Sequence, residues 1–211
     1  MPLYTIEKPK DGSTIAIWEM TESETELQEM CSLSNSEREE MLFITSEQRR
    51  KERLTVHLLL CQLLNKKFYL NYHDNGRPFL QNEIGDISIA HTKRFVSVIY
   101  HTSEHVGIDI ECAARDFSAV EKRALAESER DYLSEKNSNA QLCLIWGAKE
   151  AIFKYLCETG VNFAEQIEIE KFTLRKQGKI NALFIDKEGD KIKFTLHYRM
   201  IDDHVMVWIV A

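Results

Sequence analysis

The hydrophobic pattern of the first half of the chain predicts a strand, a helical region and three further strands. Apolar and polar residues alternate over 13–19, which is typical of a half-buried strand. The spacing is helical over about 21–44, and Ser46 can cap a long amphipathic helix that ends at about Leu64. Three apolar-rich segments separated by short polar breaks then predict an antiparallel meander: 86–92, 95–102 and 105–111.

The second half repeats this order of helices followed by strands. The spacing is helical over about 118–135 and over about 138–158, and the latter predicts a long helix that Gly160 ends. Four strand-like segments follow: about 168–174, 180–186, 191–198 and 205–210. The two halves together predict an α+β fold of two pseudosymmetric lobes, residues 1–102 and 103–211, each a small antiparallel sheet packed with a long helix.

Composition and charge narrow the class of protein. The 211 residues include 27 Lys and Arg against 34 Asp and Glu, a net charge of −7, so nucleic acid is not an expected partner. The apolar run over 58–64 is far shorter than the roughly 20 residues that cross a bilayer, so no membrane association is expected. The start of the chain lacks a basic patch followed by an apolar run, so the cytosol is the expected compartment. Five scattered cysteines without a Cys-x-x-Cys pair are expected to be reduced, mostly buried thiols.

The segment Gly107-Ile108-Asp109-Ile110-Glu111 places two carboxylates on one face of a predicted strand, because side chains alternate along a strand. A hard cation such as Mg²⁺ binds carboxylate oxygens at about 2.0–2.1 Å and completes its octahedron with waters and substrate phosphates. The pair therefore suits a magnesium site. The motif alone leaves open an ordinary acidic sheet face that points to solvent.

The predicted helix over 138–158 carries an aromatic, an acid and a base in one stripe. Trp146, Glu150 and Lys154 recur every four residues, and Lys149 lies beside them. A surface Glu-to-Lys pair next to a core tryptophan also fits this spacing. His91, at the end of a predicted strand, can face a phosphate or serve as a hydrogen-bonded edge residue.

Taken in order, these motifs resemble the 4′-phosphopantetheinyl transferase superfamily. The order is Gly76-Arg77-Pro78, Ile89-Ala90-His91-Thr92, Gly107-Ile108-Asp109-Ile110-Glu111 and Trp146-Gly147-Ala148-Lys149-Glu150-Ala151-x-x-Lys154. The resemblance covers about 46–154 and is closest to the longer, single-chain pseudodimeric branch, the type that activates surfactin synthetase. It implies Mg²⁺-dependent transfer of the phosphopantetheine arm of coenzyme A to a serine of an acyl, aryl or peptidyl carrier protein, with release of adenosine 3′,5′-bisphosphate.

The resemblance also implies which residues act in catalysis. Asp109, Glu111 and Glu150 would be the metal ligands. Glu150 is the first candidate for the base that deprotonates the serine and Glu111 the second, while Lys154 would protonate the departing phosphate. Because one pseudosymmetric chain forms both sides of the cleft, a monomer is expected.

Coenzyme A would be held from both lobes. Lys149 and Lys154 would meet the pyrophosphate, His91 a phosphate, and the turn with Arg77 and Pro78 the nucleotide. The family usually carries an arginine where this chain aligns His57, so another basic residue of the same helix is expected to hold the 3′-phosphate. The candidates are Arg49, Arg50 and Arg53.

The sequence leaves two alternatives to an enzyme of this family. The main one is a protein that binds coenzyme A without turnover. The other is a zinc site built from His101, His105 and Asp109, which is disfavoured because strand alternation separates these side chains. The carrier protein is expected to dock on apolar residues of the second lobe. These are Ala124, Leu125 and Leu133.

Overall fold

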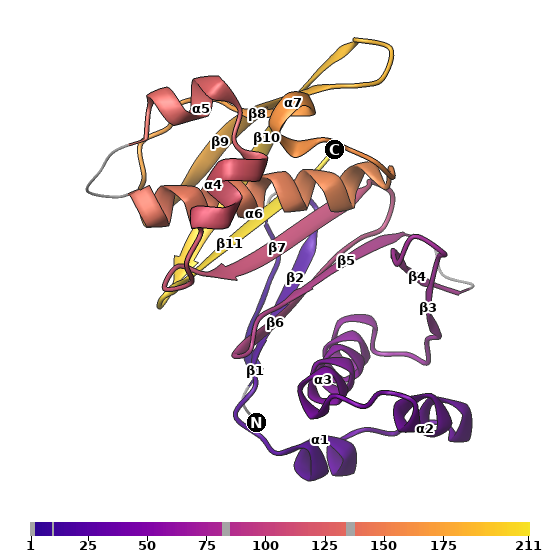
Figure 1. Cartoon of the computed structure of the whole chain (residues 1–211). Coiled ribbons are helices and arrows are strands. Elements are labelled where there is room, and N and C mark those ends of the chain that lie inside the picture. The colour runs from indigo at the N-terminus through magenta and orange to yellow at the C-terminus, as the bar shows by residue number, and fades with distance from the viewer. Residues whose placement is uncertain (1–2, 10, 82–84, 134–137) are drawn as a thin grey trace.

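The computed structural model describes residues 3–9, 11–81, 85–133 and 138–211 and contains two lobes (Figure 1). The first lobe comprises β1 (Leu3–Glu7), β2 (Thr14–Glu19), α1 (Glu24–Met30), α2 (Asn35–Leu42), α3 (Glu47–Leu64), β3 (Leu70–Tyr72), β4 (Pro78–Leu80), β5 (Asp86–His91) and β6 (Phe95–His101). The second comprises β7 (Val106–Cys112), α4 (Ser118–Ala124), α5 (Glu127–Asp131), α6 (Ser138–Leu156), α7 (Phe163–Gln166), β8 (Ile167–Ile169), β9 (Gln177–Ile185), β10 (Lys191–Ile201) and β11 (His204–Val210). The predicted α+β class is confirmed.

The two lobes share one order of connections. In the first lobe β2 leads into helices α1 to α3, and the chain returns through β5 to β6, which pairs with both β5 and β2. In the second lobe β7 leads into helices α4 to α7, and the chain returns through β9 and β10 to β11, which pairs with both β10 and β7. All these pairs are antiparallel, so the predicted pseudosymmetry has a topological basis.

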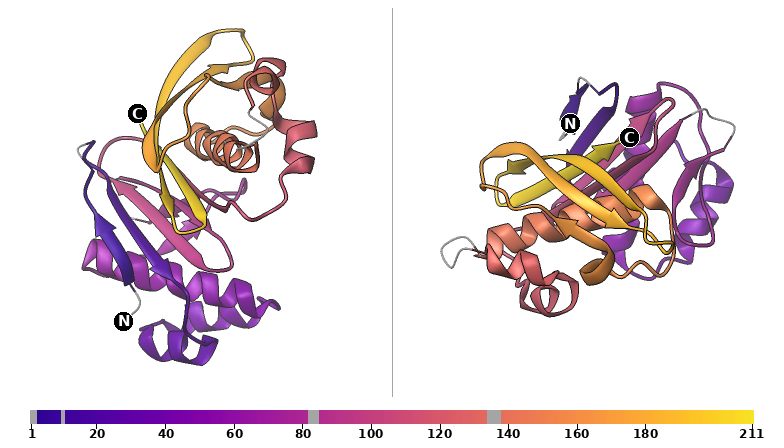
Figure 2. Two further views of the ribbon diagram at one scale, coloured as in Figure 1. Left: turned by 90° about the vertical axis from the view of Figure 1, so that its left-hand side faces the viewer. Right: turned by 90° about the horizontal axis from the view of Figure 1, so that it is seen from above.

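Three apolar clusters bury the faces of the two main sheets. The long helix α3 covers one face of the first sheet, where Trp18 is buried, and α6 covers one face of the second, where Val207 is buried. The remaining faces pack on each other through side chains such as Ile17 and Trp208. Figure 2 shows the resulting order, with the long helices outside and the sheets between them. Strand β2 is therefore buried on both faces, where its alternating pattern predicted a half-buried strand.

Several local expectations need correction. The segments over 86–111 do not form one meander, because β7 leaves β6 and pairs with β11 in the second sheet. The helical spacing over about 21–44 corresponds to two helices, and Ser34 caps the second, α2, in a capping box with Glu37. All five cysteines are free, but Cys61 is exposed and two more are partly exposed, so the prediction of mostly buried thiols is wrong. Among the helices of the described ranges, none is long and apolar enough to span a bilayer.

The lobes meet where β5 lies beside β7. Here two side chains of β5 accept hydrogen bonds from the backbone of β7: Asp86 Oδ2 from Val106 N at 3.0 Å, and Ser88 Oγ from Ile108 N at 3.1 Å. These bonds satisfy edge N–H groups that a backbone ladder would otherwise use. The two sheets therefore stay separate while their edges remain in contact, and the functional residues gather along this junction.

Candidate active site

Helix α6 approaches β7 closely because two glycines leave room for it. A Cβ atom at Gly107 would lie 2.0 Å from the backbone oxygen of Ala151, and one at Gly147 would lie 3.5 Å from Asp109 Oδ2. Real Cβ contacts are longer than the first of these distances, so a side chain at Gly107 would push the helix off the strand. The two glycines thus bring the acids of β7 against the polar stripe of α6.

A cavity of about 350 Å³ opens at this contact. Asp109 and Glu111 line it from β7, and Glu150 and Lys154 line it from α6, together with Trp146. The first lobe contributes Arg49 from α3 and His91 from the end of β5. The structure therefore brings both metal-ligand candidates of the strand, the helix stripe and two phosphate-binding candidates into one site.

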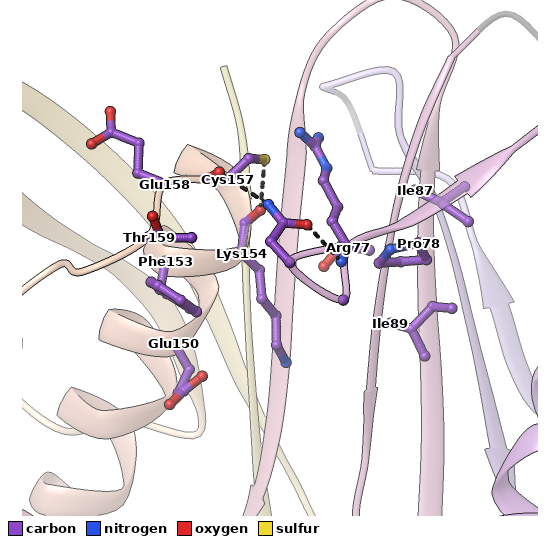
Figure 3. A pocket seen from close by; sticks show the side chains of 13 residues that line it. Arg77, Pro78, Ile87, Ile89, Glu150, Phe153, Lys154, Cys157, Glu158 and Thr159 are labelled. Atoms are coloured by element: carbon purple, nitrogen blue, oxygen red, sulfur yellow. Dashed lines mark hydrogen bonds between the residues drawn. The ribbon is translucent and has the colours of Figure 1, made fainter. Parts of the chain in front are cut away.

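A second cavity, of about 260 Å³, continues from the first along the lobe junction. The two share Ile89, Glu150 and Lys154 in their walls. Arg77 and Pro78 line the second cavity, and Figure 3 shows their turn facing the end of α6 across it. Asn75 Nδ2 donates to the backbone oxygen of Cys157 at 3.3 Å, which ties this turn to the second lobe. The two cavities therefore present different groups to a ligand: Arg77 lines one, and the acids Asp109 and Glu111 line the other.

The carboxylate of Asp109 is only half satisfied. Lys154 Nζ donates to its Oδ1 at 2.8 Å and to the backbone oxygen of Ile108 at 3.0 Å. Its Oδ2 is buried and has no hydrogen-bond partner among the described residues. A buried carboxylate oxygen without a partner is costly, so this atom favours a cation or a donor from outside the chain.

The pKa values of the Glu111 and Glu150 carboxyl groups are both raised. Burial, followed by repulsion from the Asp109 carboxylate, raises the pKa of Glu150 to about 7. The same two causes, in the same order, raise the pKa of Glu111, although Arg115 and Trp146 oppose them. Trp146 Nε1 donates to Glu111 Oε1 at 2.9 Å, and Arg115 Nη1 donates to the same oxygen at 3.1 Å. Positive charge entering the cavity would relieve this repulsion.

The donor set fits Mg²⁺, whose preferred protein ligands are carboxylate oxygens. An octahedron with bonds of 2.0–2.1 Å keeps its ligand oxygens within about 4.2 Å of one another. In the described part of the chain, no choice of one oxygen each from Asp109, Glu111 and Glu150 brings all three within 4.8 Å. Holding one ion with all three residues therefore requires a change of rotamer in a glutamate side chain.

The first lobe presents a fixed pair of nitrogen groups to the same cavity. Arg49 Nη1 donates to His91 Nε2 at 2.8 Å and to Glu52 Oε2 at 2.8 Å. Burial, with the Arg49 charge as a further cause, lowers the pKa of His91, although Glu52 opposes this. The geometry makes Nε2 an acceptor, so the ring is neutral here and orients Arg49 toward the acids. Farther along the junction, the guanidinium of Arg77 pairs with Asp86 and lies 3.3 Å from His105 Nδ1.

Comparison with known families finds a match within the second lobe. A model of the 4′-phosphopantetheinyl transferase superfamily matches residues 105–208, nearly the whole of that lobe. Residues 105–208 are a domain of this superfamily. Among curated proteins, none matches the chain. The matched family implies a phosphopantetheinyl transferase, an enzyme that acts on carrier proteins.

The transferase domain supplies the acids, and the lobe before it supplies further groups of the cavity. Asp109, Glu111, Glu150 and Lys154 lie within the matched residues, whereas Arg49, Arg77 and His91 lie outside them. The longer pseudodimeric subtype therefore stays a prediction for the chain as a whole.

Lys149 does not reach this cavity, and its predicted contact with pyrophosphate is wrong. Its side chain is 0% exposed and forms an ion pair with Glu129 Oε2 at 2.7 Å. Its Nζ also donates to the backbone oxygens of Ala124, Phe163 and Ile167 at 2.6–2.9 Å. Lys149 is next to Glu150 on a helix, so the two side chains point about 100° apart, and Lys149 turns into the core of the transferase domain.

Arg53 also lies away from the site, contrary to its assignment as a coenzyme A contact. Its guanidinium stacks over the Tyr72 ring at 4.6 Å and contacts Glu40 at 3.4 Å, and it lines neither cavity. Arg50 pairs with Glu24. Of the three arginines that the sequence offered on this helix, Arg49 is the one that lines the cavity.

The expected docking surface and the rival zinc site both fail in the structure. Ala124 and Leu125 are each 3% exposed and belong to the core of the transferase domain, so they offer no surface to a carrier. Leu133 is partly buried against the same core. The apolar pattern around Ala124 and Leu125 fits both a core and a docking surface, and only tertiary packing distinguishes these two roles.

The rival zinc site is not assembled. The ring of His101 accepts hydrogen bonds from the backbone N–H groups of Ser103 and Glu104 in the turn that follows it, and His101 does not line the cavity of Asp109.

Sequence reasoning missed Arg115, which lines the cavity and binds both oxygens of Glu111 at 3.1 Å. Arg115 comes four residues after Glu111, a spacing that predicts a contact on a helix. Here Glu111 lies at the end of a strand and Arg115 in the following loop, so no rule of sequence spacing predicts this contact. Phe153, Cys157 and Thr159 also line the second cavity and had no chemical signal in the sequence.

Proposed function

We propose that the chain transfers the 4′-phosphopantetheine group of coenzyme A to a serine hydroxyl of an acyl or peptidyl carrier protein and releases adenosine 3′,5′-bisphosphate. The observation that carries this proposal is the convergence of three acids, Lys154 and Arg49 on one cavity at the lobe junction. Phosphoryl transfer depends mainly on positioning and on charge stabilisation, and these groups supply both.

Coenzyme A would lie along the two connected cavities. Arg77 and Pro78 would contact its nucleotide, where Arg77 already has a carboxylate partner that fixes its orientation. Arg49 and His91 would contact phosphate at the other end, next to the acids. Lys154 lines both cavities, which suits a contact with the pyrophosphate that connects the two ends.

In the transfer step, the serine oxygen bonds to the phosphorus that carries pantetheine, and the bond from this phosphorus to the oxygen of the leaving nucleotide breaks. Glu150 is our first candidate to accept the serine proton, because its carboxylate lines both cavities beside Lys154. Glu111 is the second candidate. Lys154 would donate a proton or a hydrogen bond to the departing phosphate oxygen.

Asp109, Glu111 and Glu150 would hold Mg²⁺, which when bound supplies positive charge for the pyrophosphate oxygens. The unpartnered Oδ2 of Asp109 and the raised pKa values of both glutamates support a cation at this place. We also propose a monomer, since one chain lines both sides of the cavity. Free cysteines and the use of coenzyme A are consistent with the cytosol.

The test is incubation with coenzyme A, Mg²⁺ and an apo carrier protein, followed by intact mass spectrometry of the carrier. We expect the carrier to gain one phosphopantetheine with the wild type and with the matched control Arg53→Gln, whose side chain lines neither cavity and contacts Tyr72 and Glu40. Asp109→Asn should give no gain within the same time. Tight coenzyme A binding without any gain of carrier mass would contradict the proposal and favour a binding protein without turnover.

A further inference from the structure

A second group of ligand-type side chains lies on the opposite face of β7 from the acids. Cys112 follows Glu111 directly, so its side chain points to the other face of the strand. There it meets His204, its partner in the β7–β11 ladder, and Asp203 from the turn between β10 and β11. In the described ranges, Cys112, Asp203 and His204 are the residues whose ligand atoms all lie within 4.8 Å of one another.

The backbone fixes this group. Ile201 and His204 are ladder partners, so Asp202 and Asp203 form a two-residue turn, and Asp202 takes a φ of 52°. Asp tolerates this left-handed conformation better than most residues. The backbone oxygen of Asp203 accepts a hydrogen bond from Ala113 N at 2.8 Å, which ties the turn to the end of β7.

The distances are close to those of a tetrahedral site. Zinc bonds of about 2.3 Å to sulfur and about 2.0–2.1 Å to nitrogen or oxygen place neighbouring ligand atoms about 3.3–3.6 Å apart. Cys112 Sγ lies 3.6 Å from Asp203 Oδ2, which already matches. His204 Nδ1 lies 2.8 Å from the other oxygen, Asp203 Oδ1, so metal binding through Oδ2 would replace this hydrogen bond by a bond from Nδ1 to the metal.

The surroundings hold the histidine ligand in place. His204 is 4% exposed, its ring packs edge-on against Phe95 at 4.8 Å, and its Nε2 lies 3.1 Å from Thr92 Oγ1. A contact of this kind to the second ring nitrogen is typical of histidine ligands. Arg94 is the nearby cation: its shortest contacts, 2.7 Å each, go to Glu19 and Asp202, and its Nη1 also lies 3.3 Å from Asp203 Oδ1, which leaves Oδ2 as the oxygen of Asp203 offered to a metal.

We propose that Cys112, Asp203 and His204 bind a zinc-class divalent cation, with the fourth position open to solvent. Sulfur and imidazole ligands select such a metal over Mg²⁺, which prefers the oxygen-only cluster on the opposite face of β7. The exposed side chain of Asp203, at 54%, provides access. Since Thr92 of the first lobe contacts the ring of His204, a bound cation here would strengthen the junction between the lobes. The proposal does not depend on the transferase activity.

Cobalt(II) is a spectroscopic probe for this site, because a thiolate ligand gives a charge-transfer absorption that carboxylate ligands do not. We expect Co²⁺ added to the full-length protein, in the presence of excess Mg²⁺, to give this absorption and Zn²⁺ to abolish it. Cys112→Ser should remove the absorption, and His204→Gln should weaken Co²⁺ affinity by more than about tenfold. The band should persist in Asp109→Asn, which alters only the acidic cluster, and in Cys61→Ser, which removes an exposed thiol on α3.

A measurement on the wild type avoids any question of folding in the variants. Zn²⁺ should slow the alkylation of Cys112 by iodoacetamide, mapped by peptide mass spectrometry, while Cys61 in the same sample reacts at an unchanged rate. Zn²⁺ should also raise the midpoint of thermal unfolding. A cobalt spectrum without a thiolate band, a band that depends on Cys61, or equal protection of the two cysteines would overturn the proposal.

Discussion

Two lysine–carboxylate pairs of the transferase domain have nearly the same length but different surroundings. Lys149 and Glu129 lie 2.7 Å apart, and Lys154 and Asp109 lie 2.8 Å apart. Both side chains of the first pair are 0% exposed, whereas the lysine of the second is 28% exposed. Glu129 also accepts hydrogen bonds from Ala126 N and Ile169 N, so both of its oxygens are used. Asp109 keeps one oxygen without a partner among the residues that the structure describes.

The difference separates an ion pair that builds the fold from one that is available for chemistry. Lys149 and Glu129 connect the ends of α4 and α5 to α6 and β8, and every charged atom has its partner inside the chain. Lys154 and Asp109 both line a cavity, so a ligand that enters it can bind either side chain without disturbing the core. Distance alone does not distinguish these roles, but burial and complete hydrogen bonding do.

The largest effect on stability is expected from Lys149→Met. Removing the lysine leaves Glu129 buried with an uncompensated charge, which costs about 3–5 kcal/mol of the free energy of unfolding. Urea unfolding followed by circular dichroism measures this loss. Lys122→Met, on the exposed side of α4, is the control and should stay close to the wild type. A loss of less than about 1 kcal/mol would mean that the buried pair does not build the fold.

Glu150→Gln should stabilise the protein at alkaline pH. The pKa of Glu150 is about 7 in the folded chain against 4.5 as its ordinary value, and each unit corresponds to about 1.36 kcal/mol. The folded state holds a proton that the unfolded state releases between these values, so the carboxylate costs up to about 3 kcal/mol above pH 7 and nothing below pH 4.5.

Urea unfolding at pH 8 and pH 5, in chelator, tests this difference. The variant should exceed the wild type in stability at pH 8, and the gain should shrink at pH 5. The exposed Glu188→Gln should show no gain at either pH. Equal stability of Glu150→Gln and the wild type at pH 8 would show that burial and the neighbouring acids do not penalise the ionised carboxylate of Glu150.

The smallest effect concerns two arginines one turn apart on α3. Arg49→Gln should raise the Michaelis constant for coenzyme A by about tenfold with little change in kcat, because it removes one charged hydrogen bond to phosphate. Arg53→Gln should leave both constants unchanged, since its partners are Tyr72 and Glu40. Steady-state kinetics with varied coenzyme A measures both. An equal increase of the Michaelis constant in the two variants would contradict the assignment of Arg49 as a phosphate contact.

Periodicity was enough to find the elements that carry the site. The cap at Ser46, the long helix α6 and the facing of Asp109 and Glu111 are all local properties, and the structure agrees with them. The placement of Lys149 depends instead on which segments pack around α6, and Glu129 is twenty residues earlier in the chain. The pairing of β7 with β11 is also non-local, because the two strands are about a hundred residues apart.

A comparison of rate and stability in Lys154→Met tests the central claim most directly. The account predicts a smaller loss of the free energy of unfolding than in Lys149→Met, because Lys154 is 28% exposed although Asp109 is buried, and a transfer rate per folded molecule lower by at least about a hundredfold. Urea unfolding and carrier mass spectrometry on the same preparation give both values. A large loss of stability together with a normal rate per folded molecule would contradict the account, because Lys154 would then have the role assigned to Lys149.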